Sequence, residues 1–304
     1  MHFLAEPIQE QLNRLESSKA PITLDALHQV IMSPKASKAT AYCLIHGRAC
    51  EHPRACVHFA GTPCVNFSSM GDGSKCDGRT SQHFAAWASL RLRLREPIII
   101  HENVPEFPLA VLTKFFGHLY NIQSVELHPD DYGWASRRPR AWRVLTLKQC
   151  SIQRPVSVIE NAFRRPCAMT YLDYLVEDDE HLQQERQWAA SRPSNANKHL
   201  TSESSFYDTL TDVERDYLSV YREHWPGAVC MLGQNPRRVP IVSSRTTLNT
   251  VIKHAGLMWT DRAPQPRWLS PRELLLSQGF PFEPRNKATT SFHINREALG
   301  FTAR

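Results

Sequence analysis

The chain has 304 residues, of which 41% are hydrophobic, enough to bury the core of one large or two modest domains. Its formal net charge of +6 permits a polyanionic partner but does not require one. Its eight cysteines lack the spacing of a disulfide framework, no run of about 18 apolar residues predicts a membrane span, and the first residues lack the features of a signal peptide. A reducing, intracellular compartment is therefore expected.

The first half of the chain alternates predicted helices and strands. Residues 1–40 are expected to be helical, although their pattern is weak outside "PITLDALHQVIM". The elements then expected are a strand over 55–61, a helix over 81–94, a strand over 97–104, a helix over 109–119 and strands over 120–127 and 141–148. This alternation predicts an α/β fold with a parallel sheet.

The composition changes from about residue 151. The segment 176–188 is charged and predicts a helix, and residues 191–205 are polar and predict a loose linker. Apolar, structured composition returns in "SRTTLNTVIKHAGLMW" and "RWLSPRELLLSQGFPFEP".

Chemically active side chains lie next to three of the predicted strands. Pro63 and Cys64 follow the first strand, and Glu102, Asn103 and Val104 end the next. Just before a third strand come Arg138 and Arg140. The carboxyl ends of parallel strands form the crevice in which open α/β sheets bind ligands. The sequence therefore predicts that a thiol, a carboxylate and guanidinium groups share one pocket.

These residues occur within four ordered motifs, so the chain resembles the cytosine-5 DNA methyltransferase family over about residues 55–283. The nucleophile motif matches at Pro63, Cys64, Phe67, Ser68, Gly71 and Arg79, although Val65 stands where Gln is usual. Glu102, Asn103 and Val104 match the second motif, and Arg138 and Arg140 keep both arginines of the third. The late motif matches at Arg267, Leu269, Arg272, Glu273, Gly279, Phe280 and Pro281. Four matches in order are far more specific than any one of them.

The resemblance implies a Rossmann-like methyltransferase fold with a smaller, irregular target-recognition region. It also implies that the thiolate of Cys64 adds to carbon 6 of a cytosine flipped out of DNA. Glu102 would then donate to ring nitrogen 3, Arg140 would bind the ring oxygen and Arg138 would support the nucleophile loop. The expected substrate-binding and loop positions are Pro63, Phe67, Ser68, Gly71, Arg79, Asn103 and Val104.

The implied cofactor is S-adenosylmethionine, for which only Pro63 and, more weakly, Gln82 match contact positions of the family. Residues 1–54 lack the Phe-x-Gly-x-Gly loop that holds this cofactor, and the tail after Pro281 lacks the final Gly-Asn. Two alternatives therefore remain beside the DNA methyltransferase. One is a catalytically inactive relative that binds DNA or a partner, and the other is an RNA cytosine-5 methyltransferase.

The expected organisation is a helical N-terminus over 1–40, a catalytic half over 41–150, a variable target-recognition region over 151–245 and a C-terminal return to the methyltransferase domain over 246–304. Within it, residues 244–250 resemble the Thr-containing segment that lies near the target in this family. DNA is the expected partner, and no association with a membrane is expected. A nuclear location is expected only because DNA is the substrate.

Plainer explanations exist for the same residues. Taken alone, Cys64 is a buried structural thiol, Glu102 a strand-end acid, and the arginines a solvated basic turn. Arg267 and Glu273 are expected to be structural. The six residues Cys43, His46, Cys50, His52, Cys56 and His58 do not have the spacing of a standard zinc finger, so no metal site is predicted.

Overall fold

The computed structural model describes residues 24–32, 40–64, 81–150, 155–176, 179–195, 198–201, 204–251, 256–260 and 266–280. The chain forms two compact units. Unit 1 comprises Met1–Leu127 and Pro139–Phe163, and unit 2 comprises His128–Arg138 and Arg164–Arg304. The short segment of unit 2 therefore interrupts unit 1 between two of its strands.

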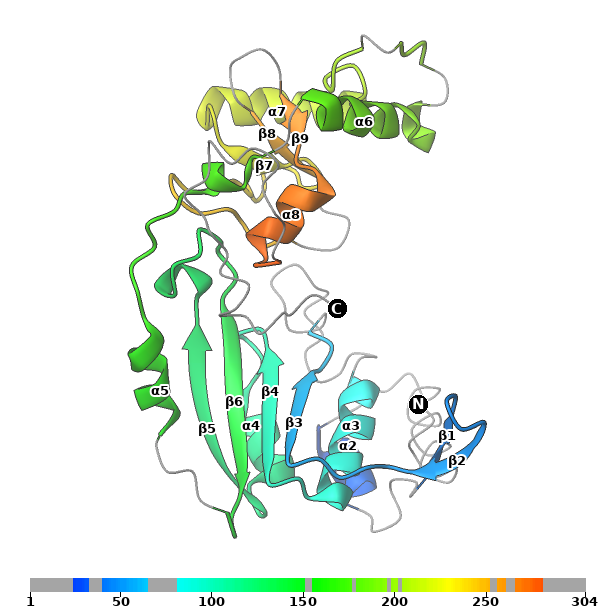
Figure 1. Ribbon diagram of the computed structural model, residues 1–304, viewed down its shortest axis with the longest axis vertical. Helices are drawn as coiled ribbons and strands as arrows, with labels where there is room; N and C mark the ends of the chain where they lie inside the picture. Colours follow the sequence, from blue (N-terminus) through cyan, green and yellow to red (C-terminus); the bar gives the residue numbers. More distant parts are fainter. Residues whose placement is uncertain are drawn as a thin grey trace. The chain divides into compact units, whose positions relative to one another are not determined.

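Unit 1 is built on a four-stranded sheet with the order β3-β4-β6-β5 (Figure 1). Its strands are β3 (Val57–Gly61), β4 (Ile98–Asn103), β5 (Tyr120–Leu127) and β6 (Arg140–Leu147). β3 and β4 are parallel, as predicted, but β6 runs antiparallel to both β4 and β5. The expectation of a wholly parallel sheet is wrong because β5 returns directly into β6 through residues 128–139, without the crossover helix that a parallel neighbour needs.

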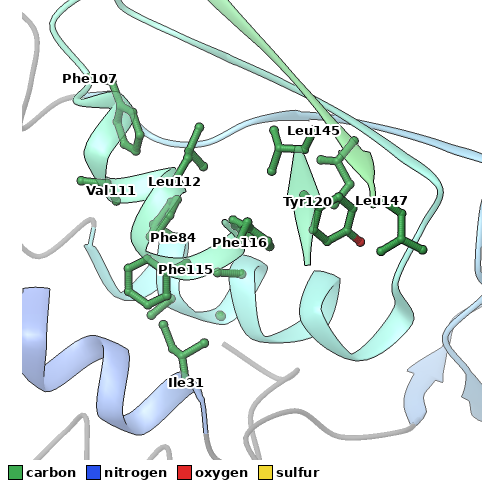
Figure 2. Packing of buried hydrophobic residues seen from close by; sticks show 14 of the residues in the cluster. Ile31, Phe84, Phe107, Val111, Leu112, Phe115, Phe116, Tyr120, Leu145 and Leu147 are labelled. Atoms are coloured by element: carbon green, nitrogen blue, oxygen red, sulfur yellow. The ribbon is translucent and has the colours of Figure 1, made fainter. Parts of the chain in front are cut away.

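The described helices of unit 1 are α2 (Leu24–Ile31), α3 (Ser81–Leu94), α4 (Leu109–Phe116) and α5 (Val156–Phe163). The bounds of α3 are those predicted from its apolar spacing. Figure 2 shows how Phe84 of α3 packs with Phe115 of α4 in the core; their ring centroids are 5.4 Å apart in an edge-on arrangement. Such aromatic contacts add to the free energy gained from apolar burial.

Before β3, a separate antiparallel hairpin is formed by β1 (Thr40–Cys43) and β2 (Arg48–Glu51). No strands were expected at these positions. The hairpin is not part of the four-stranded sheet, and β3 has β4 on one side with no described strand on the other.

Unit 2 combines short strands with helices. A three-stranded antiparallel sheet consists of β7 (Val229–Met231), β8 (Leu257–Trp259) and β9 (Arg267–Trp268). The α-helices are α6 (Asp179–Ala190), α7 (Asp212–His224) and α8 (Pro271–Ser277), with 3-10 turns at Pro129–Asp131, Tyr171–Tyr174 and Pro193–Asn195. Both α7 and α8 begin with a capping box, in which the cap hydroxyl and the carboxylate three residues later bind each other's main chain.

The expectation of a loose linker over 191–205 is wrong for the described part of that segment. Asn195 is buried and donates from Nδ2 to the carbonyl oxygens of Ala189 and Thr209, both at 2.9 Å. Lys198 donates to the carbonyl oxygens of Asp208 and Leu210. A polar composition cannot distinguish such a tethered segment from a free one, because the tether consists of main-chain acceptors.

Within the described ranges, no helix combines the length and apolar character needed to cross a membrane.

Candidate active site

The strand ends of unit 1 bring the predicted nucleophile and the predicted acid to the same edge of the sheet. Gly61 of β3 is paired with Glu102 of β4, and both strands run in the same direction (Figure 1). Pro63 and Cys64 follow immediately after β3, and Cys64 is half-buried against the hydrophobic core. Its thiol is therefore held by packing while part of its surface remains open.

A buried network of hydrogen bonds joins the segment before Cys64 to β4. The Thr62 hydroxyl shares a hydrogen bond of 2.8 Å with Nε2 of His101. Asn103 donates from Nδ2 to the carbonyl oxygen of Thr62 at 3.1 Å and to its hydroxyl at 3.0 Å. The other end of the Asn103 amide accepts from the main-chain N–H of Val104 at 2.9 Å. These bonds fix the direction in which the chain leaves β3 toward Cys64.

Glu102 and Arg140 form an ion pair at this edge. Nε of Arg140 lies 2.7 Å from Oε1 of Glu102, and Nη1 of Arg140 donates to the carbonyl oxygen of Pro139. Arg140 begins β6, the other neighbour of β4. The carboxylate is thus oriented by a guanidinium group from the adjacent strand.

Glycine at position 61 leaves room for this carboxylate. A Cβ atom there would lie 3.1 Å from Oε2 of Glu102. A larger residue would force the Glu102 side chain to move.

The site is backed by a neutral histidine. Burial lowers the pKa of His101 to about 3, and the nearby positive charge of Arg143 acts in the same direction. Arg143 is itself buried and donates to the carbonyl oxygen of Phe107 at 2.6 Å. The imidazole therefore enters the network with Thr62 uncharged at neutral pH.

The remaining predicted site residues have different places in the structure. Val104 is buried in the core and Asn103 in the network with Thr62, so the contacts seen for both are internal to unit 1. Phe67, Ser68, Gly71 and Arg79 lie outside the described residues, and Gln82 lies in the first turn of α3, where its side chain is not described. Substrate and cofactor roles for these positions stay predictions.

Arg138 belongs to unit 2, so its role beside Cys64 also stays a prediction. In that unit its neighbour Arg137 donates from the main chain to the carbonyl oxygen of Leu248 at 2.7 Å, and Thr250 donates its hydroxyl to the carbonyl oxygen of Arg137. Within unit 2, Arg137 and residues 248–250 therefore lie side by side, although they are far apart in sequence.

Sequence reasoning missed Thr62 and His101 as members of the site. Neither residue is among the motif positions that match the family. Their contact depends on the register of β3 and β4, which pairs Gly61 with Glu102 and so brings Thr62 close to His101 and Asn103.

Arg267 and Glu273 of the late motif form a buried pair, in agreement with the structural role expected for them. Arg267 donates two hydrogen bonds of 2.8 Å to the two carboxylate oxygens of Glu273. Glu273 also accepts from the main-chain N–H of Ser270, the N-cap of α8. This pair joins β9 to the start of α8.

Comparison with solved structures gives low similarity. A prophage-encoded DNA modification methyltransferase structure from E. coli is 21% identical, with 40% of this chain and 35% of that chain covered and a TM-score of 0.32. The methyltransferase EhMeth of Entamoeba histolytica is 15% identical, with coverage of 77% and 68% and a TM-score of 0.37. The Dnmt2 methyltransferase of S. pombe is 14% identical, with coverage of 77% and 69% and a TM-score of 0.42. The chain thus spans about a third of the length of the first of these structures.

Comparison at the level of sequence families is decisive. No curated protein matched the chain. The family model described as C-5 cytosine-specific DNA methylase, however, matches residues 57–296, which include both the strand-end site of unit 1 and the late motif of unit 2. The chain belongs to the C-5 cytosine-specific DNA methylase family.

Proposed function

We propose that the chain is a cytosine-5 methyltransferase acting on DNA, with Cys64 as its nucleophile. The observation that carries the proposal is the edge formed by β3, β4 and β6. There the half-buried Cys64 follows one strand, while Glu102 on the next is held 2.7 Å from Arg140 on the third. A thiol, an acid and a guanidinium group are the groups needed to activate a pyrimidine ring by covalent addition.

The chemistry of the chain's own residues follows from this arrangement. The thiolate of Cys64 adds to carbon 6 of the cytosine, and the π electrons of the 5,6 double bond move toward carbon 5 and the ring. A proton shared between Glu102 and ring nitrogen 3 neutralises the charge that develops there. Arg140 holds the carboxylate in place and stabilises charge on the ring oxygen.

Carbon 5 then carries an electron pair and can act as the nucleophile that accepts a methyl group. After substitution at carbon 5, a base removes the remaining proton from that carbon. The electrons reform the 5,6 double bond and expel the Cys64 thiolate. The cytosine must leave the helical stack for the thiol to reach carbon 6.

Among the described residues, the site for the implied methyl donor, S-adenosylmethionine, is incomplete. Residues 40–56 form a hairpin and its connection rather than a glycine-rich cofactor loop, and no described strand lies beyond β3 to extend the sheet on that side. Of the two implied cofactor positions, Pro63 follows β3 and Gln82 lies in the first turn of α3. No step is therefore assigned to the donor.

Methyl transfer from labelled S-adenosylmethionine tests the proposed function. The full chain is expected to label duplex DNA and not tRNA, and Cys64→Ser is expected to abolish the labelling. Cys56→Ser is a matched control because this exposed cysteine lies before β3. Labelling of tRNA alone would replace DNA by RNA as the substrate, and labelling that survives in Cys64→Ser would refute the nucleophile.

A catalytically inactive relative is the second candidate, and the uncovered side of β3 among the described residues favours it. Calorimetric titration with S-adenosylmethionine separates the candidates. Saturable binding by the full chain supports the enzyme, whereas duplex DNA binding without cofactor binding supports the inactive relative.

A further inference from the structure

The hairpin of β1 and β2 places two cysteines on one face. Ala41 is paired with Cys50, so these two side chains point to the same side. Cys43 is two residues from Ala41 along β1 and therefore shares that side. The strand register thus brings Cys43 and Cys50 together although six residues separate them.

The turn brings a histidine to the same place. Gly47 adopts a φ of 61°, a left-handed conformation that glycine adopts without strain, and its N–H donates to the carbonyl oxygen of Cys43 at 2.8 Å. This turn returns His46 over the hairpin, and Nδ1 of His46 lies 3.3 Å from Sγ of Cys50.

Together, one ligand atom from each of Cys43, His46 and Cys50 lies within 4.8 Å of the others. Nitrogen and sulfur ligands at about 2.0 and 2.3 Å from a tetrahedral zinc ion are themselves about 3.6 Å apart. The separation between His46 and Cys50 is close to this value, so only a small movement is needed to bind a metal ion.

The hairpin has little else to stabilise it. The side chains of Leu44 and Ile45 at its tip are both 90% exposed, and Tyr42 is also exposed. None of its residues belongs to the buried core of unit 1. An isolated two-stranded hairpin is at best marginally stable in water, and small domains of this kind are commonly held together by a structural metal.

We propose that Cys43, His46 and Cys50 bind a zinc ion that clips the β1–β2 hairpin together. Two thiolates and an imidazole are ligands that zinc prefers, and they leave a fourth tetrahedral position for solvent or another ligand.

The other members of the cysteine and histidine run do not join this group. His58 lies in β3, as predicted from sequence, and its ring is bound by Nε1 of Trp87 at 3.2 Å and by Nη1 of Arg91 at 3.0 Å. Cys56 is exposed and lies outside the group. The six residues together do not have the spacing of a standard zinc finger, but three of them form a smaller group of ligands.

The test is metal analysis of the full chain, purified under reducing conditions with zinc present and then dialysed. Wild type is expected to retain a stoichiometric zinc ion, and Cys43→Ser and Cys50→Ser are expected to lose it. Cys56→Ser is the matched control and is expected to keep it. Replacement of zinc by Co²⁺ is expected to give thiolate-to-cobalt charge-transfer absorption in wild type and Cys56→Ser, and none in Cys43→Ser.

A second measurement keeps the proposal falsifiable if a variant binds weakly. Amide hydrogen exchange in residues 40–51 of wild type is expected to slow when Zn²⁺ is added, while exchange in β4 stays unchanged. The proposal is overturned if wild type binds neither metal, if the cysteine variants retain zinc as well as wild type does, or if Cys43 and Cys50 are joined by a disulfide in the reduced preparation.

Discussion

At the scale of single residues, the site depends on buried polar groups that satisfy one another. Thr62 is hydrogen-bonded to both His101 and Asn103, whereas the hydroxyl of Thr146, which is buried in β6, has no hydrogen-bond partner among the described residues. Removing a partner from a buried group costs free energy, but removing a hydroxyl that bonds nothing does not. The two threonines therefore provide a matched pair.

We predict that Thr62→Val lowers the free energy of unfolding by about 1–3 kcal/mol, because it leaves His101 without its bond. Thr146→Val is expected to be neutral or stabilising. Urea unfolding of both variants tests this, and an equal loss in the two would contradict the role given to the network.

The neutral state of His101 predicts a dependence of stability on pH. Its folded pKa of about 3 lies below the unfolded value of about 6.5, so between these values the unfolded chain binds a proton that the folded chain does not. Its contribution is fully present above pH 6.5 and is lost as pH falls toward 3. The cost is about 1.4 kcal/mol per pH unit within that window.

We predict that His101→Gln reduces this acid destabilisation. Unfolding free energies of wild type and the variant, measured from pH 7 to pH 5, are expected to converge as pH falls. Parallel slopes would show that His101 does not titrate in this way.

At the scale of elements, local pattern predicted position better than direction. The apolar spacing of α3 gave its bounds, because three or four apolar positions per two turns decide which face is buried. The antiparallel direction of β6 could not be predicted, because its sequence is equally apolar in either direction. It is set by the connection over 128–139, which returns the chain beside β5 instead of crossing the sheet.

The capping boxes of α7 and α8 predict unequal effects of the same substitution. Glu273 is fully buried and bound to Arg267, whereas Glu214 pairs with the partly exposed Arg192. Glu273→Gln leaves a buried guanidinium without its charge partner and is expected to cost about 3–5 kcal/mol. Glu214→Gln keeps an oxygen for its cap and is expected to cost about 1 kcal/mol or less. Thermal or urea unfolding of the two variants tests the difference, and similar losses would contradict it.

At the scale of the whole molecule, the boundaries of the two compact units differ from the domain boundaries predicted from the sequence. The predicted boundaries fall at 40, 150 and 245, whereas the two units separate at 127, 138 and 163. A compact unit can be discontinuous in sequence. Residues 128–138 belong to unit 2, although they connect β5 and β6, which are paired strands of unit 1. Composition varies smoothly along the chain and cannot indicate such an excursion.

The candidate site was predictable to a similar extent. Ordered motifs and strand ends were enough to predict that Cys64 and Glu102 lie at one edge, whereas Arg140, which begins β6, reaches this edge only because β6 is antiparallel to β4. The ion pair and the network with His101 were not predictable, because both depend on which residues face each other across strands. The grouping of Cys43, His46 and Cys50 was not predictable for the same reason, since these residues meet only through the register of a hairpin.

The central claim is that Cys64 adds covalently to a cytosine ring. Duplex DNA that carries 5-azacytosine tests it most directly. Nitrogen in place of carbon 5 makes carbon 6 more electrophilic and removes the carbon-bound hydrogen whose loss helps to expel the thiol. Wild type and Cys56→Ser are expected to form a protein–DNA adduct that survives denaturing electrophoresis, and Cys64→Ser is expected to form none. Absence of the adduct in wild type, or its persistence in Cys64→Ser, would contradict the account.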